Sequence, residues 1–167
     1  MFGDIRRMNA GECERRSINL VVAVPETDID VTLDNTVMRR VIQNLLHNAI
    51  KFTPDGGVVE VIVSCNCTNS SSAVAMTGLL VVTINDTGIG CSSVNSSPEV
   101  GCRRIQAPTS TCGVEGSGFG LTIVHALMRA LGGTFTIQSP GGTMHCANVT
   151  ASTTAIVSVP VTFARLP

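Results

Sequence analysis

The run RRVIQNLLHNAIKFTPDGG, residues 39–57, combines the apolar spacing of an amphipathic helix with polar residues that such a helix does not need. We expect a helix that is capped by Asp34 or Asn35 and runs to about Phe52. The run also holds Lys51, the only lysine among eleven basic residues, just before a Phe-Thr-Pro-Asp-Gly-Gly stop. The residues expected to cover the apolar faces are Val37, Val41, Ile42, Leu45, Leu46 and Ile50.

Two asparagines and the lysine share one face of this helix. At about 100° per residue, Asn48 lies roughly 40° to one side of Asn44, and Lys51 lies roughly 20° to the other. Arg40 and His47 flank the same face. Amide oxygens suit a Mg²⁺ ion that keeps several waters and shares phosphate oxygens, and an ammonium suits the same phosphates. A solvated polar face is the alternative interpretation of this helix taken alone.

The composition is that of a globular domain, with 44% hydrophobic and 14% charged residues in 167. A formal net charge of −1 gives no electrostatic case for a nucleic acid or an anionic membrane as partner. No apolar run reaches the length of a transmembrane helix, and the N-terminus lacks the apolar core of a signal peptide. Seven irregularly spaced cysteines favour free thiols over a zinc site. We therefore expect a cytoplasmic chain without direct membrane contact, whether or not a parent protein is membrane-anchored.

The rest of the chain alternates between strand and helix patterns. Predicted strands cover residues 17–24, 31–33, 56–65, 78–86, 134–139 and 155–163, and a second helix covers residues 121–133 and ends at glycine. The Gly/Ser/Pro-rich connection over residues 88–118 is long enough to be a functional lid or a disordered segment. Strands and helices in one layer each predict an α/β two-layer sandwich, a mixed sheet covered on one face by helices.

Two glycine-containing motifs accompany these elements. In the first, a strand ends at Asp86, and Gly88 and Gly90 follow. A carboxylate there can accept a hydrogen bond from an exocyclic amine, and glycines let the backbone approach a ligand, although a turn capped by aspartate has the same pattern. In the second, GSGFGL over residues 116–121 directly precedes the second helix and offers backbone N–H groups to a phosphate. It fits neither a Rossmann fingerprint nor a P-loop.

The order of the motifs is more specific than any one of them. A helix with Asn-x-x-x-Asn-Ala-x-Lys, a strand with Asp-x-Gly-x-Gly, a long connection and Gly-x-Gly-x-Gly before a helix follow one another. This order resembles the ATP-binding domain of sensor histidine kinases, which belongs to the ATPase superfamily of DNA gyrase and the large heat-shock chaperones. The resemblance runs from about Ile18 to Phe163. The segments TLDNTVMRRVIQNLLHNAIKFTPDGG and ALGGTFTIQSPGG are similar to the family's first helix and closing hairpin.

The resemblance implies a role for each motif residue, with ATP and Mg²⁺ as the bound groups. Asn48 would coordinate Mg²⁺ with Asn44 beside it, and Lys51 would reach a phosphate. Phe52 would wall the nucleotide site, and Asp86 would bind the adenine amino group. The other implied nucleotide-binding residues are Gly88 and Gly90 at the adenine and Gly116, Ser117, Gly118, Phe119, Gly120 and Leu121 at the phosphates under the lid.

Position 44 also bears on the reaction. Related ATPases of the superfamily that hydrolyse ATP commonly carry glutamate there as a general base. An amide cannot take a proton from water at neutral pH. Asn44, the implied catalytic residue, therefore favours holding ATP for transfer, and we predict weak intrinsic ATPase activity.

The implied function is that of the catalytic domain of a two-component sensor histidine kinase. It would transfer the γ-phosphoryl group of ATP to a histidine on a separate or missing segment, for phosphorelay to a response regulator. Residues 1–16 would be a linker from a missing dimerisation hairpin, and residues 17–167 the ATP-binding domain. The sequence contexts of His47, His125 and His145 are not those of a phosphoacceptor.

The connection CSSVNSSPEVGCRRIQAPTSTCGVE, residues 91–115, lacks the Phe-containing motif that the family carries in its lid. Arg103 and Arg104 could reach phosphates from it. A catalytically inactive nucleotide- or partner-binding module of the same fold is therefore the alternative function. A protein-serine kinase of the same superfamily, as in anti-sigma factors, is a third interpretation.

Overall fold

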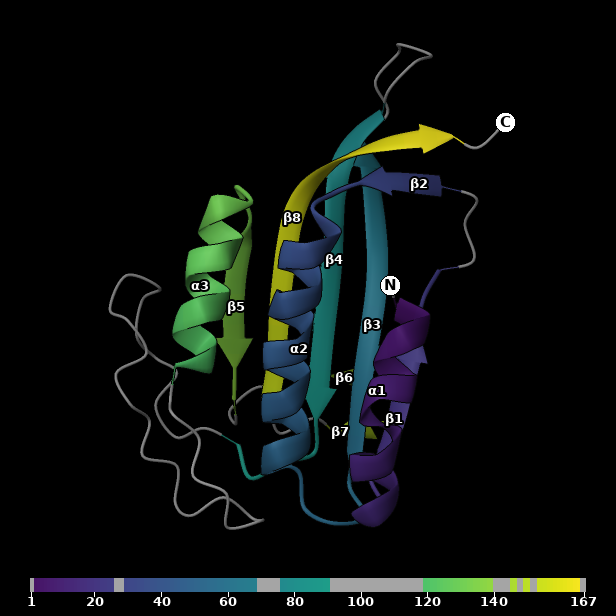
Figure 1. Cartoon of the computed structure of the whole chain (residues 1–167), viewed down its shortest axis with the longest axis vertical. Coiled ribbons are helices and arrows are strands. Elements are labelled where there is room, and N and C mark those ends of the chain that lie inside the picture. Colours follow the sequence, from purple (N-terminus) through teal and green to yellow (C-terminus); the bar gives the residue numbers. More distant parts are fainter. Residues whose placement is uncertain are drawn as a thin grey trace.

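The computed structural model describes residues 2–25, 29–68, 76–90, 119–139, 145–146, 149–150 and 153–165. Over these residues the helices are α1 (Phe2–Arg15), α2 (Asn35–Phe52) and α3 (Gly120–Ala130) (Figure 1). The strands are β1 (Asn19–Ala23), β2 (Ile29–Thr32), β3 (Val58–Thr68), β4 (Met76–Asp86), β5 (Thr134–Gln138), β6 (His145–Cys146), β7 (Val149–Thr150) and β8 (Thr153–Arg165). Among the residues described, no helix is long and apolar enough to span a membrane.

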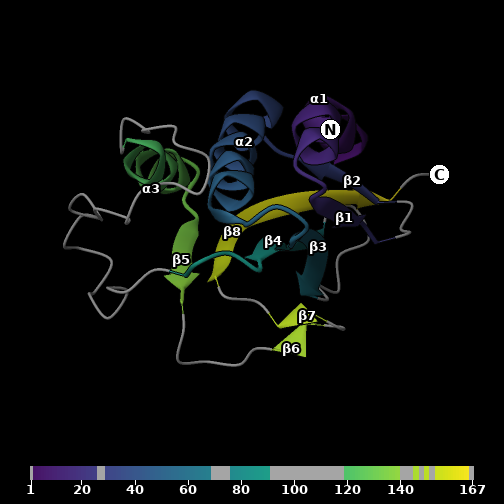
Figure 2. The same cartoon turned by 90° about the horizontal axis from the view of Figure 1, so that it is seen from below.

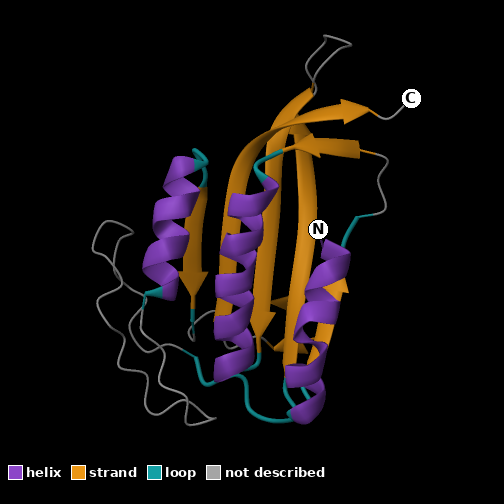
Figure 3. Ribbon diagram, in the orientation of Figure 1, coloured by secondary structure: helices purple, strands orange, loops and turns teal. Residues whose placement is uncertain are grey.

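Six strands form one sheet in the order β1-β3-β4-β8-β2, with β5 also paired to β8. β1 and β3 are parallel and the other pairs antiparallel, so the sheet is mixed. β8 holds β4 along one edge and β2 and β5 at the two ends of the other. The three helices lie on one face of the sheet, and the small β6–β7 pair lies on the other (Figure 2). The predicted α/β two-layer sandwich is confirmed (Figure 3).

Buried apolar residues of both layers meet between the sheet and the helices. On α2 they are Met38, Val41, Ile42, Leu45, Leu46, Ala49 and Ile50. On the sheet they include Val59, Val61 and Val63 of β3, Leu80, Val82 and Ile84 of β4, and Val157, Val159, Val161 and Phe163 of β8. Because these strand residues alternate, they point to the same face. The residues predicted to cover the apolar faces of α2 are buried, except Val37, which is half-buried. Met38 and Ala49, which were not in that predicted set, are also buried.

Helix α2 begins and ends at local signals in the sequence. The Asp34 side chain accepts hydrogen bonds from the backbone N–H groups two and three residues later, at 3.0 and 3.1 Å. At the other end, the N–H and the hydroxyl of Thr53 both donate to the Ala49 carbonyl, at 3.0 and 2.7 Å. A proline follows and cannot continue the helix. The predicted bounds of this helix are confirmed, with Asp34 as the cap.

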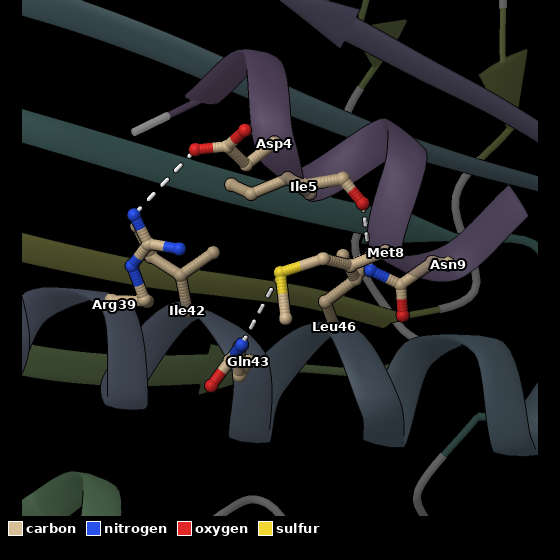
Figure 4. A pocket seen from close by; sticks show the side chains of 8 residues that line it. All are labelled: Asp4, Ile5, Met8, Asn9, Arg39, Ile42, Gln43 and Leu46. Carbon is tan, nitrogen blue, oxygen red and sulfur yellow. Dashed lines mark hydrogen bonds and ion pairs between the residues drawn. The ribbon is translucent and has the colours of Figure 1, made fainter.

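Residues 2–15 form helix α1, where the sequence predicts a linker. Ile5 and Cys13 are 5% and 6% exposed and belong to the same core as α2. The Asp4 carboxylate lies 3.6 Å from the Arg39 guanidinium of α2, beside a small hollow between the two helices (Figure 4). The segment is therefore a packed part of the domain. It was not predicted as a helix because few of its residues are apolar and their spacing is sparse.

The glycine pair that the sequence predicts as a helix stop joins α3 to β5. Gly132 has a φ of +67°, which glycine adopts without strain. A β-carbon on Gly133 would lie 2.5 Å from the carbonyl oxygen of Ser158 and 2.7 Å from Cε of Met128. Only glycine fits at that position, and the close approach fixes the end of α3 against β8.

Candidate functional site

The first residue of α3 faces the two asparagines of α2. A β-carbon built on Gly120 would lie 3.4 Å from Oδ1 of Asn44, and 3.6 and 3.9 Å from Nδ2 and Oδ1 of Asn48. Both asparagines are half-buried. A β-carbon at this position would therefore be in ordinary van der Waals contact with both amides, with no further group between them. The helix motif and the last glycine of the glycine-rich motif, 72 residues beyond Asn48, therefore meet at one place.

The Asn44 amide is held by a hydrogen bond within α2. Its Nδ2 donates to the carbonyl oxygen of Arg40, one turn earlier, at 2.7 Å. With the nitrogen engaged, Oδ1 is the Asn44 atom nearest to the Gly120 position. That oxygen can accept a hydrogen bond or coordinate a hard cation, but it cannot serve as a general base at neutral pH.

Lys51 and Phe52 form the last turn of α2. Lys51 is only 9% exposed, which is unusual for lysine. Its ammonium nitrogen lies 5.4 Å from the centroid of the Phe52 ring, within cation–π range. A cation is also favourable at this end of a helix, where the backbone dipole is negative. The structure thus holds the only lysine at the carboxyl end of the helix that carries the asparagines.

The Asp86 turn packs directly on the same end of α2. Asp86 ends β4 and is 6% exposed, and its Oδ1 accepts a hydrogen bond from the Gly88 N–H at 2.9 Å. A β-carbon on Gly88 would lie 2.5 Å from that Oδ1 and 2.7 Å from the Phe52 carbonyl oxygen. The next N–H, of Ile89, donates to the same carbonyl at 3.2 Å. The second motif is therefore joined to the first by backbone contact.

Burial makes the Asp86 carboxyl a weaker acid than an exposed aspartate. It raises the pKa of Asp86 to about 6, although hydrogen bonds from the Gly88 N–H and the Thr153 side chain act in the opposite direction. At neutral pH the group is still mostly ionised, so it only accepts hydrogen bonds. A buried carboxylate that ends a strand is suited to binding a polar hydrogen-bond donor.

A row of polar side chains supports the strand ends beside Asp86. The Asn85 Nδ2 donates to Oε2 of Glu60 at 3.1 Å, and the Thr154 hydroxyl donates to Oδ1 of Asn85 at 2.9 Å. The three residues are 9%, 1% and 5% exposed, in the order Glu60, Asn85, Thr154. They alternate with core residues and so lie on the sheet face away from the helices. We call them the polar row. It links β3, β4 and β8 where β4 ends at the Asp86 turn.

Residues 33–162 match the family described as histidine kinase-, DNA gyrase B- and HSP90-like ATPases. The chain belongs to this ATPase family. The matched range contains α2, the Asp86 turn and α3, the three elements that the structure brings together.

Relatives of this ATPase-family domain include sensor kinases. The sensor histidine kinase Hik2 of Synechocystis sp. is 35% identical over 129 residues, which cover 76% of this chain and 28% of Hik2. The chain spans about a quarter of the length of the curated relatives it matches. The names of these relatives agree with the expected enzyme class, a protein histidine kinase.

Solved structures of histidine kinases share the fold. The catalytic domain of ThkA aligns with a TM-score of 0.64 at 18% identity, over 95% of this chain and 89% of that one. Full-length ShkA in complex with AMPPNP aligns with a TM-score of 0.60 at 21% identity, over 99% of this chain and 30% of that one. The resemblance to the ATP-binding domain of sensor histidine kinases is confirmed.

The remaining residues predicted to bind nucleotide in this ATPase-family domain are placed as follows. Gly90, after the Asp86 turn, has a φ of +73°. Phe119, directly before α3, is 65% exposed. Leu121 is half-buried and packs against the core, so its side chain serves the fold. Gly116, Ser117, Gly118, Arg103 and Arg104 lie outside the described residues.

Among the described residues, Thr153 and Arg16 also contact the site, although neither belongs to a motif. Thr153 hydrogen-bonds the Asp86 side chain and is its register partner between β8 and β4. A predicted last strand that begins at residue 153 instead of 155 would have included Thr153. Arg16 donates to the carbonyl oxygens of Ile50 and Thr53 at the end of α2. Nothing in the local sequence indicates this contact, because its partners lie 34 and 37 residues away.

Proposed function

We propose that this domain binds ATP with Mg²⁺ and presents the γ-phosphoryl group for transfer to a histidine on another segment or another chain. The meeting of three motifs on one helix carries the proposal. Gly120 lies opposite Asn44 and Asn48, and further along the same helix the Gly88 backbone packs on Phe52. A nucleotide has a polar base at one end and phosphates at the other, and this arrangement offers a matching group to each end.

The Asp86 turn is suited to the adenine end. Asp86 already accepts hydrogen bonds from the Gly88 N–H and the Thr153 side chain, and the carboxylate retains lone pairs for a further donor. An exocyclic amine is such a donor. The closeness of Gly88 to the Phe52 carbonyl keeps side chains out of this turn, so backbone and carboxylate together shape the base-binding surface.

The asparagine end is suited to phosphates and Mg²⁺. Asn44 and Asn48 supply neutral, hard oxygen atoms, a donor set that fits a Mg²⁺ ion sharing most of its coordination with phosphate oxygens and water. We assign Asn48 to the metal, and Lys51 to a phosphate. Bound Mg²⁺ would neutralise charge that develops on the phosphates during transfer. The N-terminus of α3 beside the asparagines adds a partial positive charge.

The proposed reaction is phosphoryl transfer with little hydrolysis. A ring nitrogen of the acceptor histidine would attack the γ-phosphorus, the bond to the bridging oxygen would break, and ADP would leave. Such a transfer needs positioning and charge neutralisation more than proton removal. Asn44 offers no base for water. The proposed partners are a His-bearing dimerisation domain and a downstream response regulator, in the cytoplasm. Residues 1–16, whose helix α1 packs on this domain, would lead to it from the dimerisation domain.

Calorimetric titration with AMPPNP, with and without Mg²⁺, tests the nucleotide site. We expect Mg²⁺-dependent binding by the wild type and its loss in Asn48→Ala. Asn19→Ala, which truncates an exposed asparagine of β1, is the matched control and should bind as the wild type does. Absence of binding to the folded wild type would contradict the proposal and leave a partner-binding module.

Transfer is tested separately, with γ-labelled ATP and a His-bearing dimerisation segment as acceptor. The kinase function is supported if the segment becomes labelled and if the labelling is lost when its histidines are replaced. Nucleotide binding without transfer to this acceptor or to a histidine domain encoded beside this chain favours the inactive binding module.

A further inference from the structure

Arg16 is a buried arginine that none of the nucleotide-binding motifs includes. It follows α1 and is 3% exposed. Its Nε donates to Oδ1 of Asp55 at 2.8 Å, and its two terminal nitrogens donate to the carbonyl oxygens of Ile50 and Thr53, at 2.7 and 2.6 Å. Removing a guanidinium from water is costly unless several partners replace the solvent. The partners found here are two backbone carbonyls and a carboxylate.

The two carbonyls belong to the end of α2, where helix geometry leaves acceptors without intrahelical donors. The backbone dipole also places partial negative charge there, so a cation is favourable. The planar guanidinium can reach three acceptors in fixed directions, which a lysine ammonium cannot do. Arg16 therefore ties the segment after α1 to the last turn of α2. Lys51 and Phe52 belong to that turn.

The last turn of α2 also contacts the Asp86 turn. The Phe52 carbonyl lies between those that Arg16 binds, and it accepts the Ile89 N–H at 3.2 Å. Gly88 is packed so closely on this carbonyl that no β-carbon fits, and its N–H donates to Asp86. A displacement of the Phe52 carbonyl would therefore shift Gly88 and the Asp86 carboxylate with it.

We propose that Arg16 is a positioning residue for the nucleotide site. Without touching the nucleotide, it holds the last turn of α2 so that Lys51, Phe52 and the Asp86 turn keep their relative places. This inference rests on the proposed function. A purely structural arginine would contribute to the stability of the fold and leave the affinity of the folded protein for nucleotide unchanged.

Two substitutions and two controls separate these roles. Arg16→Gln removes the charge and the guanidinium fork, and Arg16→Lys keeps the charge but not the planar fork. Phe163→Leu and Val161→Ala truncate buried core residues in the part of β8 far from its Asp86 contact, and provide destabilised proteins with an intact site. Each variant is titrated with Mg²⁺-ADP at a temperature where circular dichroism shows it to be folded.

The expected result is a loss of affinity in Arg16→Gln of about tenfold, the factor that corresponds to 1.4 kcal/mol. Arg16→Lys should bind with intermediate affinity. The core variants should keep the wild-type dissociation constant even where their melting temperature falls as far as that of Arg16→Gln. Equal dissociation constants for Arg16→Gln and the core variants would overturn the proposal.

Amide hydrogen exchange of the nucleotide-free protein tests the link independently of any ligand. The Ile89 N–H should exchange faster in Arg16→Gln than in the wild type, and at the wild-type rate in the core variants at matched stability. Unchanged protection of Ile89 in Arg16→Gln would overturn the proposed link. If the wild type binds no nucleotide, the proposed function fails, and the exchange result still decides whether Arg16 orders the turn.

Discussion

A β-carbon added to Gly88 would lie 2.7 Å from the carbonyl oxygen of Phe52, so the Asp86 turn and the end of α2 meet with no room for a side chain. The contact joins two segments that are 36 residues apart, and both belong to the proposed nucleotide site. It also makes the geometry of one segment depend on the other.

Gly88→Ala should therefore weaken both stability and nucleotide binding. Forcing a methyl group into this contact should cost about 1–3 kcal/mol in the free energy of unfolding, as for other overpacked sites. Urea denaturation and titration with Mg²⁺-ADP measure the two effects. Gly11→Ala is the control, because a β-carbon on Gly11, within α1, meets nothing within 4 Å. That change should increase stability by up to about 1 kcal/mol and leave binding unchanged.

Asp86→Asn should weaken nucleotide binding. An asparagine can still accept the Gly88 N–H through its oxygen, but it presents an NH₂ group in place of the second carboxylate oxygen. We expect nucleotide affinity to fall by about a hundredfold or more, since two donors would face each other and a charge-assisted hydrogen bond is lost. Calorimetry of the folded variant measures this effect. Wild-type affinity would rule out Asp86 as the adenine-binding group.

The same variant should change how stability depends on pH. Because the pKa of Asp86 is raised from 3.8 to about 6, the folded protein holds its proton more tightly than the unfolded chain does. The contribution of this group to stability therefore falls as the pH rises from about 4 to about 6, by on the order of 3 kcal/mol, and is constant above that window. Asp86→Asn lacks this fall, so its stability relative to the wild type should increase across the window. Urea denaturation at pH 4 to 7.5 checks this, with the exposed Glu14→Gln as a control for net charge.

Lys51→Met should discriminate between the two ends of the nucleotide. Methionine keeps the length and apolar character of the buried stem but removes the ammonium. If Lys51 contacts a phosphate, ATP and ADP should bind at least about tenfold more weakly, a loss of about 1.4 kcal/mol, whereas adenosine should bind as it does to the wild type. Competition titrations with the three ligands measure the ratio. If adenosine and ATP lose affinity equally, Lys51 does not contact a phosphate, and the substitution acts through the structure of the end of α2.

The isolated domain should hydrolyse ATP slowly. A turnover well below about 1 s⁻¹, the lower end of typical enzyme values, is expected because Asn44 has no proton affinity suitable for activating water. Release of inorganic phosphate from Mg²⁺-ATP measures it, with Asn48→Ala as the background. Turnover comparable to that of a dedicated ATPase, lost in Asn48→Ala, would contradict the assignment of Asn44.

The sequence predicts a structural feature well when the residues that cause the feature are close together in the chain. The bounds of α2 follow from an aspartate cap and a Thr-Pro stop that act within a few residues, and the structure confirms them. Gly88 was expected to admit a ligand. The structure adds that its nearest neighbours are Asp86 and the Phe52 carbonyl, so the fold itself already requires glycine there.

Long-range features could not be predicted in the same way. The bonds of Arg16 cross 34 to 39 residues, and the acidity of Asp86 follows from burial that the complete domain creates. The helix α1 was missed because its contact with the core depends on only a few apolar residues, such as Ile5 and Cys13.

The polar row of Glu60, Asn85 and Thr154 has a consequence for how the strands align. Apolar side chains on a sheet tolerate a slip by two residues, because the same face still meets the same kind of neighbour. Such a slip of β4 would bring Asn85 opposite Val58 or Ile62 and leave the buried Glu60 without its amide partner. It would also carry Asp86 about 7 Å along β3, away from the end of α2. The row therefore selects the one strand alignment in which Asp86 and Phe52 can meet.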